Sequence, residues 1–144
     1  MLCMVEMKSF VRERKIRNAP LYVALDEAYE YALSEVRRAD WLSQREVVYC
    51  MRELKKAYEQ EKKILQENEE FYTKWLNNLI EDMTYMVYRD RINIPELEVL
   101  VAKRAFLADV FEPILKRYNV WDDDVDIFGY MTTLIDNMLE EAKG

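Results

Sequence analysis

Carboxylates are the side chains whose spacing in this sequence best suits chemistry. Glu27 and Glu30, and again Glu67 and Glu70, are three residues apart, which places each pair on one face of a helix. Magnesium-dependent nucleotide hydrolysis on a helical scaffold uses such pairs, together with a second motif, typically Glu-x-x-Asp, that the sequence lacks. We therefore interpret both pairs as solvated helix faces, and magnesium-dependent catalysis is the least favoured of three functional classes.

A second carboxylate pattern lies near the C-terminus. Asp122, Asp124 and Asp126 alternate as the first ligands of a calcium-binding loop do. The sixth position of such a loop would be Ile127 instead of glycine, and the twelfth would be Thr133 instead of glutamate. The pattern instead indicates the acidic start of a helix, where carboxylates favour the free backbone amides.

The residue types that are missing exclude several common sites. The sequence has no histidine, which excludes imidazole catalysis, zinc ligation by histidine and carboxylate–histidine di-iron centres. Its only glycines are Gly129 and Gly144, so it has no glycine-rich phosphate loop. We predict no catalytic residue, no cofactor and no metal site, and hence a protein that is not an enzyme.

The cysteines and the apolar segments bear on location. Cys3 and Cys50 have no CxxC spacing and are interpreted as core thiols. The first apolar residues are interrupted by Glu6 and Lys8, and no run approaches the roughly 20 apolar residues that span a bilayer. We expect an intracellular protein without a signal peptide or a transmembrane segment.

Charge suggests a binding surface. The net charge is −7, with a basic segment at residues 1–21 and a strongly acidic one at residues 121–144. An acidic protein is poorly suited to neutralising phosphates, so direct nucleic-acid binding is not expected. The acidic C-terminal segment could instead occupy a basic groove of a protein partner, such as a nucleic-acid enzyme, by mimicking phosphate charge. Its candidate contact residues are Asp122, Asp123, Asp124, Asp126, Asp136, Glu140 and Glu141.

Aromatic residues provide further contact candidates. The chain contains ten Tyr, eight Met and three Trp, and large, half-polar rings are favoured at interfaces. Trp41, Tyr85 and Tyr88 lie near the ends of the longest predicted helical segment, where a partner can reach them. Core or rim packing within the same chain is the alternative interpretation.

That segment, Ser43–Arg91, contains neither Gly nor Pro. Ser43 and Glu46 predict a capping box at its start, and Leu42 and Val47 occupy the positions of a hydrophobic staple. Apolar residues then recur at alternating spacings of four and three, as in a helix packed along its length against others. They are Val47, Met51, Leu54, Tyr58, Leu65, Tyr72, Trp75, Leu79 and Met86.

The middle of the segment, Gln60–Glu70, is polar and allows two structures. In one, the helix is continuous; in the other, Asn68 caps a new helix with Glu69 and Glu70 in its first turn. The absence of Gly and Pro favours the continuous helix, which we predict.

Further helices are predicted on both sides of this segment. A basic amphipathic helix spans residues 2–17, and another begins after Pro20. The apolar run Leu97–Phe111 is ended or kinked by Pro113, and a stripe from Phe128 to Leu139 marks the last helix. The predicted fold is a single all-α domain, residues 1–144, with five or six helices bundled around the long one.

Two functional classes fit this fold better than catalysis. The favoured one is a small acidic regulator or inhibitor that binds the basic groove of another macromolecule. The alternative is a structural subunit that self-assembles, as in a viral coat or a filament, through its oppositely charged ends.

Overall fold

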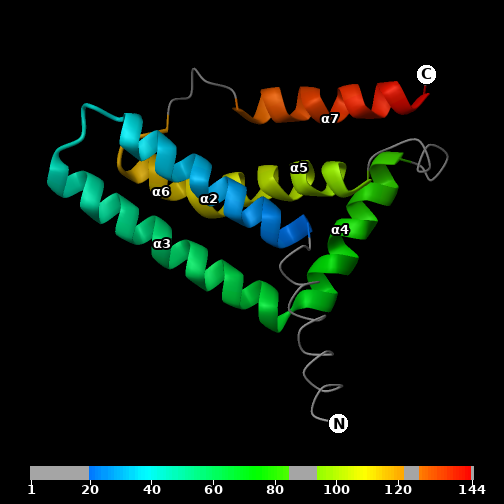
Figure 1. The fold of residues 1–144 in the computed structure, drawn as a ribbon, viewed down its shortest axis with the longest axis horizontal. Helices are drawn as coiled ribbons and strands as arrows, with labels where there is room; N and C mark the ends of the chain where they lie inside the picture. The colour runs from blue at the N-terminus through cyan, green and yellow to red at the C-terminus, as the bar shows by residue number, and fades with distance from the viewer. Residues whose placement is uncertain (1–19, 85–93, 122–126, 144) are drawn as a thin grey trace, which may run out of the picture.

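The computed structural model describes residues 20–84, 94–121 and 127–143, and all elements in these ranges are helical (Figure 1). The elements are α2 (Pro20–Arg38), α3 (Gln44–Glu67), α4 (Glu69–Thr84), α5 (Ile94–Phe106), the π-helix η2 (Leu107–Phe111), α6 (Glu112–Arg117) and α7 (Ile127–Lys143). The predicted all-α fold is confirmed. The helix predicted over residues 2–17 lies outside the described residues.

The helices pack in layers. α2 lies against α5 and η2 at the centre, and α3 packs on this pair from one side through contacts with α2, η2 and α6. α7 packs on α5 from the opposite side, so α3 and α7 form the two outer edges (Figure 1). The central position that we predicted for the long segment therefore belongs to α2 and α5.

The side of α2 that carries small side chains permits this central position. Ala24, Ala28 and Ala32 repeat every four residues and are fully buried. Small side chains allow the neighbouring helix axes to approach closely, and Leu25 and Val36 on the same helix are also fully buried. α2 is therefore enclosed on most of its circumference.

The start of α3 is the one predicted from the sequence. The backbone N–H of Glu46 donates to the Ser43 hydroxyl at 3.2 Å, and the backbone N–H of Ser43 donates to the Glu46 carboxylate at 3.1 Å. Leu42 and Val47 are half-buried against the core, as a hydrophobic staple requires. The capping box thus fixes where α3 begins.

The prediction of one continuous long helix is wrong, because the helix ends at Glu67 and a new one begins at Glu69. Asn68 leaves the helical conformation, at φ −126° and ψ 35°. Its side-chain amide and its backbone N–H both donate to the carbonyl of Ile64, each at 3.0 Å. Asn68 therefore closes the end of α3, and the polar Gln60–Glu70 stretch forms an elbow (Figure 1).

The α5–η2–α6 run explains how the chain accommodates Pro113. Proline lacks an N–H and its ring clashes with the carbonyl four residues earlier, which disfavours a regular helix before it. The chain widens into the π-helix η2, where the backbone N–H of Glu112 donates to the carbonyl of Leu107. Pro113 then occupies the first turn of α6, an early helix position that proline favours.

The end of α6 is closed by a Schellman motif. Asn119 has a positive φ of 57°, and its N–H donates to the carbonyl of Lys116 at 3.1 Å. The N–H of Val120 reaches back to the carbonyl of Leu115 at 2.8 Å, and both of these side chains are buried. Asparagine tolerates the left-handed conformation better than most residues, which suits it to this position.

The apolar track of the long segment is confirmed within the described residues. Leu54 and Leu65 are buried, and the other members up to Leu79 are half-buried against the same core. Met86 lies outside the described residues. The track therefore faces the core in spite of the elbow.

Candidate functional site

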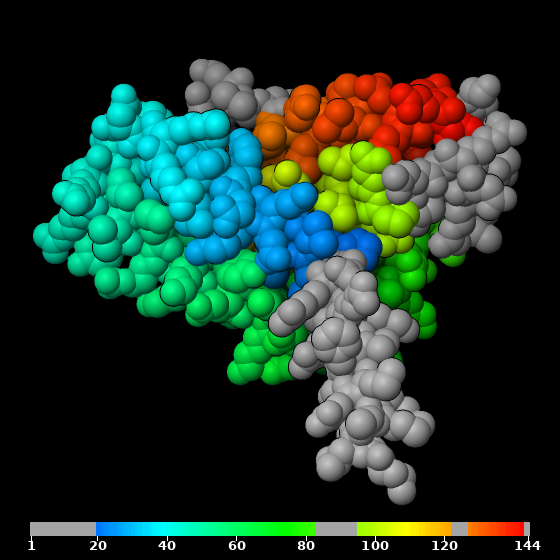
Figure 2. Space-filling model, in the orientation of Figure 1, coloured from blue at the N-terminus to red at the C-terminus, as the bar shows by residue number. Residues whose placement is uncertain are grey.

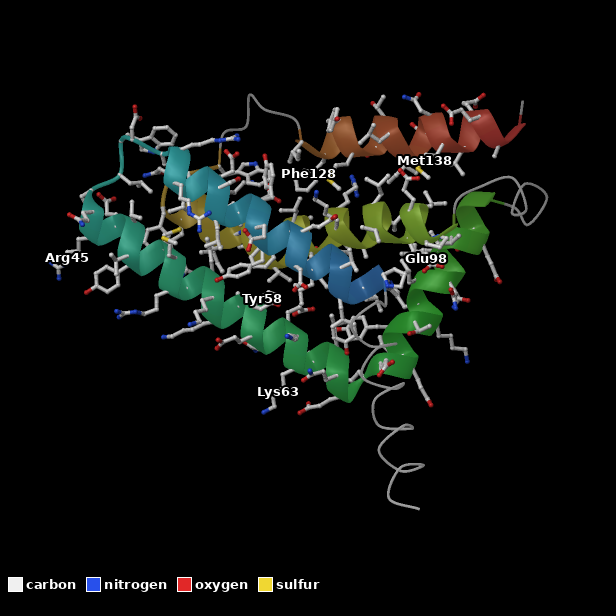
Figure 3. The ribbon with its side chains drawn as sticks, in the orientation of Figure 1. Arg45, Tyr58, Lys63, Glu98, Phe128 and Met138 are labelled. Carbon is white, nitrogen blue, oxygen red and sulfur yellow. The ribbon has the colours of Figure 1, made fainter. Side chains whose placement is uncertain are left out.

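The predicted acidic contact residues lie partly on α7. Asp136, Glu140 and Glu141 are exposed there, and Met131 and Ile135 on the opposite side of the helix are buried. Phe128 and Met138 point from α7 toward the bundle (Figure 3). The other predicted contact residues, Asp122, Asp123, Asp124, Asp126, Tyr85 and Tyr88, lie outside the described residues.

Trp41 is exposed, as an interface candidate should be, but a hydrogen bond also holds its side chain in place. The ring is 61% exposed, and its Nε1–H donates to the backbone carbonyl of Asn119 at 3.0 Å. This bond joins the α2–α3 connection to the turn after α6. Trp41 therefore lies at the end of the bundle opposite the C-terminus of α7, and the described candidates do not form one site (Figure 1).

One member of the first carboxylate pair, Glu27, contacts a neighbouring helix. Glu27 lies 3.9 Å from the ammonium of Lys103, which joins α2 to α5. Glu27 and Lys103 also line a shallow groove with Ser34 and Tyr31. Among the described residues, no three His, Cys, Asp or Glu side chains are grouped closely enough to hold a metal ion.

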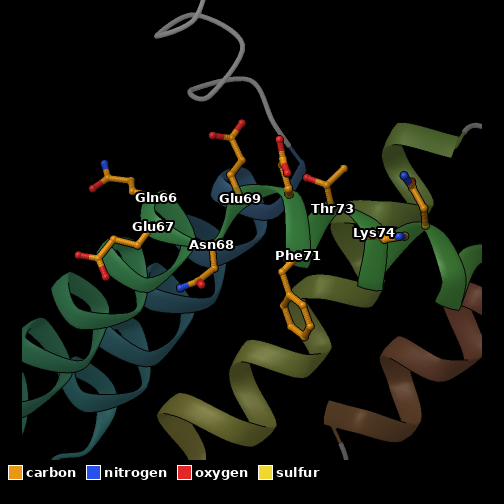
Figure 4. Close-up of a pocket in the computed structure, with 9 residues that line it drawn as sticks. Gln66, Glu67, Asn68, Glu69, Phe71, Thr73 and Lys74 are labelled. Carbon is orange, nitrogen blue, oxygen red and sulfur yellow. The ribbon is translucent and has the colours of Figure 1, made fainter.

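The second pair does not share a helix face as predicted. Glu67 ends α3 and Glu70 lies in the first turn of α4, on opposite sides of the elbow. Both line an open hollow of about 800 Å³ whose other walls include Glu69, Phe71 and Lys74 (Figure 4). Phe71 is 67% exposed, and most of the lining side chains are exposed, so the hollow does not enclose a ligand.

The surface that the sequence analysis missed is on the outer side of α3. It consists of Arg45, Tyr49, Arg52, Lys56 and Lys63, which we call the α3 outer face. These residues follow one another at spacings of four, three, four and seven residues, so at about 100° per residue they form one line along the helix. All five are exposed, and Arg45 and Lys63 point away from the bundle (Figure 3).

At the start of this face, two arginines make cation–π contacts with Tyr49. The guanidinium carbons of Arg45 and Arg52 each lie 5.7 Å from the centre of the Tyr49 ring. A cation over an exposed ring contributes about 0.5–1 kcal/mol, enough to bias both arginine side chains toward the tyrosine. The ring itself remains 43% exposed, so the face presents an aromatic surface flanked by two charges.

The cations of the α3 outer face are available to a partner. In the ranges that the structure describes, ion pairs form at Arg38, Lys103, Lys116 and Arg117, and none includes Arg45, Arg52, Lys56 or Lys63. Val48, beside Tyr49, is 49% exposed and adds apolar area. This local excess of positive charge contrasts with the net charge of −7.

The inner side of α3 holds this face outward. Tyr58 donates a hydrogen bond to Asp26 on α2 and stacks on Tyr29 with ring centres 4.4 Å apart. Burial, and then the bond to Asp26, raise the pKa of Tyr58, so its hydroxyl stays a donor at neutral pH. Tyr29 stacks in turn on Phe111 of η2, at 6.0 Å. The aromatic cluster fixes the rotation of α3 about its own axis.

An ion pair supports the same orientation. The guanidinium of Arg117 on α6 lies 3.0 and 3.2 Å from the two carboxylate oxygens of Glu53. Glu53 is therefore drawn toward α6, to one side of the α3 outer face. A spacing of four and then three residues between Arg45, Tyr49 and Arg52 was the sequence signal for this face.

Comparisons with known proteins add no assignment. No known protein family, no curated protein and no solved structure matches the chain. In the described part of the chain, no helix has both the length and the apolar character required to cross a membrane.

Proposed function

We propose that this protein is a non-enzymatic interaction protein that binds an acidic surface of another protein through the α3 outer face. The observation that carries the proposal is the line of unpaired cations around Tyr49 on a helix held by its opposite side. Arginine and tyrosine are the residue types most enriched at protein-binding surfaces, so their exposed stack suits such contact.

The neighbours of the face favour a protein partner over nucleic acid. Glu59 and Glu67 are exposed on the same line of the helix as the cations, so a stiff, continuous row of phosphates would meet them as well. A protein surface can place single carboxylates opposite the cations and apolar groups opposite Tyr49 and Val48.

Retention on immobilised poly-L-glutamate tests this proposal. The full chain should bind at about 0.05 M salt and elute by about 0.5 M, since screening shortens the reach of exposed charges. Arg52→Glu combined with Lys56→Glu should abolish retention. The matched control, Arg37→Glu combined with Lys74→Glu, changes net charge equally away from α3 and should be retained. Equal loss in both variants would contradict the proposal.

The acidic regulator predicted from the sequence is the second candidate. Asp136, Glu140 and Glu141 are exposed on a helix that packs through its opposite side, which would let them enter a basic groove. This candidate predicts retention on immobilised poly-L-lysine that Asp136→Lys combined with Glu141→Lys removes. Undiminished retention of that variant would count against it.

An intracellular location belongs to the same proposal. The buried thiol of Cys50 is free, and free thiols persist most readily in reducing compartments.

A further inference from the structure

The side of α7 that faces away from the bundle is complementary in character to the α3 outer face. Its exposed residues, which we call the α7 outer face, are Tyr130, Thr133, Asp136, Asn137, Glu140 and Glu141. Tyr130 is 62% exposed. One face thus combines a tyrosine with cations, and the other combines a tyrosine with carboxylates.

The two faces occupy opposite edges of the molecule. α3 packs on α2, η2 and α6, and α7 packs on α5, so the central layer separates them. In the space-filling view they form opposite borders of the same face of the protein (Figure 2). A single copy therefore presents both surfaces outward at the same time.

The directions of the two helices also agree. α3 and α7 both run from left to right in Figure 1, from their N-terminal to their C-terminal ends. α3 slopes downward in this view while α7 is nearly horizontal, so a second copy displaced toward the α3 edge would lay its α7 across this α3, with both helices running in the same general direction (Figure 1). In each helix the tyrosine lies toward the N-terminal end, and most of the charges follow it.

The spacing along the helices is compatible with that arrangement. Lys56 lies seven residues after Tyr49, and Asp136 lies six residues after Tyr130, which correspond to about 10 Å and about 9 Å along the axes. With the two tyrosines side by side, Lys56 is level with Asp136 along the axis, although Asp136 lies about 120° around α7 from Tyr130. Glu141 lies on the same side of α7 as Tyr130 and falls between the levels of Lys56 and Lys63. The next cation, Lys63, then lies beyond Glu141 by less than the length of its own side chain.

We propose that the α3 outer face of one copy binds the α7 outer face of the next copy, so that the protein assembles into open chains. This inference rests on the proposed function, because it names the acidic protein surface that the α3 outer face binds. Since the two surfaces differ, the contact is heterologous, and each added copy exposes a fresh α3 face at one end and a fresh α7 face at the other.

The size of the contact determines its strength. One helix of 17 residues lying on one of 24 residues forms an interface at the small end of the specific range. Association should therefore be weak, reversible and strongly dependent on protein concentration. Charge pairs that stay partly exposed also make it dependent on salt.

Light scattering of the full chain across concentration tests the proposal. The mean mass of the wild-type protein should rise with concentration at about 0.05 M salt and fall toward the monomer at about 0.5 M. Two variants remove one face each. The α3-reversed variant carries Arg52→Glu and Lys56→Glu, and the α7-reversed variant carries Asp136→Lys and Glu141→Lys.

Mixing the two variants supplies the decisive control. Alone, the first has lost the positive excess of its α3 outer face and the second the negative charge of its α7 outer face, so each should associate at least roughly tenfold more weakly than the wild type. In an equimolar mixture the intact α3 outer face of the second variant meets the intact α7 outer face of the first, and the concentration-dependent rise in mass should return. Recovery also shows that both variants are folded, because misfolded chains would not complement each other.

The outcomes separate this inference from the function on which it rests. A wild-type protein that stays monomeric at low salt and high concentration, but still binds poly-L-glutamate through α3, overturns self-assembly and leaves the proposed function standing. A wild-type protein that neither self-assembles nor binds poly-L-glutamate overturns both the self-assembly and the proposed function. Assembly that neither variant weakens, or a mixture that fails to recover it, would place the contact elsewhere and overturn the pairing of α3 with α7.

Discussion

Burial determines the chemistry of Cys50. Its side chain is fully buried in the core, and burial followed by the charge of Glu53 raises the pKa of the thiol to about 11. The nucleophilic thiolate is therefore scarce at neutral pH, and reagents cannot reach it in the native state. Cys50 has a structural role, as the sequence analysis expected.

Native Cys50 should accordingly resist alkylation. In a Cys3→Ser background, the labelling rate of the folded protein at pH 8 should be at least roughly 100-fold lower than in denaturant, because both the thiolate fraction and access fall. Mass spectrometry over a time course measures both rates. Similar rates in the two conditions would show that the core opens around α3 far more often than its packing indicates.

The Ser43 cap provides a second test at the level of single residues. Ser43→Ala should destabilise the protein by about 1 kcal/mol, because the amide of Glu46 loses its acceptor. Chemical denaturation measures this change. Glu46→Gln serves as the control and should cost much less, since an amide oxygen can still accept from the Ser43 N–H.

The same cap should respond to acid in a defined direction. The hydrogen bonds that Ser43 makes through its side chain and its backbone lower the pKa of Glu46 in the folded state. The stability that this provides is present above the ordinary carboxyl pKa and is lost as the pH falls through the lowered one. The difference between the wild type and Ser43→Ala should shrink over that acidic range.

At the level of elements, the contact between α3 and η2 contains an unfavourable pair. Burial, and then the nearby charge of Asp109, raise the pKa of Glu61 on α3. Glu61 occupies a position that the apolar track assigns to the core, which explains its partial burial. A carboxyl group with a raised pKa contributes most to stability below its ordinary pKa, and this contribution is lost as the pH rises through the raised value.

Replacement of Glu61 by glutamine should therefore stabilise the protein at pH 7. A gain on the order of 0.5 kcal/mol is expected, because like charges no longer face each other across α3 and η2. The gain should disappear near pH 4, where the native carboxyl is itself protonated. Glu59→Gln, at an exposed position two residues earlier, should change stability little at either pH.

The elements also show where sequence reasoning succeeds and where it stops. The start of α3 was predictable because a capping box is a local arrangement of Ser43 and Glu46. The break at Asn68 was not settled by local signals, since no Gly or Pro marks it. What favours the bend is that α4 can then pack on α5, a contact between distant segments that no short window of sequence contains.

The α3 outer face was likewise predictable from the sequence only in part. The residue types and spacing of Arg45, Tyr49 and Arg52 were legible in the sequence as one line on a helix. Which side of that helix faces solvent depended on Tyr58, Tyr29 and Phe111, which come from three separate elements. The overall negative charge favoured the acidic C-terminal segment over this basic face as the predicted contact surface.

At the scale of the whole molecule, the cooperativity of unfolding depends on how α7 is attached. α7 is attached to the bundle mainly through α5, by way of Met131, Ile135 and their half-buried neighbours. A helix held by one side unfolds with the rest only if that contact is strong. The single domain predicted for residues 1–144 therefore implies that α7 and α3 unfold together.

Ile135→Ala tests this expectation. Removing a buried isoleucine should cost about 2–4 kcal/mol and shift one common transition, seen alike by far-ultraviolet circular dichroism and tryptophan fluorescence. Tyr130→Ala, on the exposed side of the same helix, should cost less than about 0.5 kcal/mol. Two separate transitions in the Ile135 variant would instead mean that α7 is an independent unit.

The π-helix η2 has a consequence for tolerance to changes in chain length. Its wide turn holds one more residue than a regular α-helical turn would, so deleting a single residue within Leu107–Phe111 would restore a regular helix. Because only the extra residue is lost, the segments before and after η2 would keep their relative rotation, and Leu115 would still face the core. A deletion within the regular helix α2 would instead turn everything after it by about 100° about the helix axis. The protein should therefore tolerate the loss of one residue better in η2 than in α2.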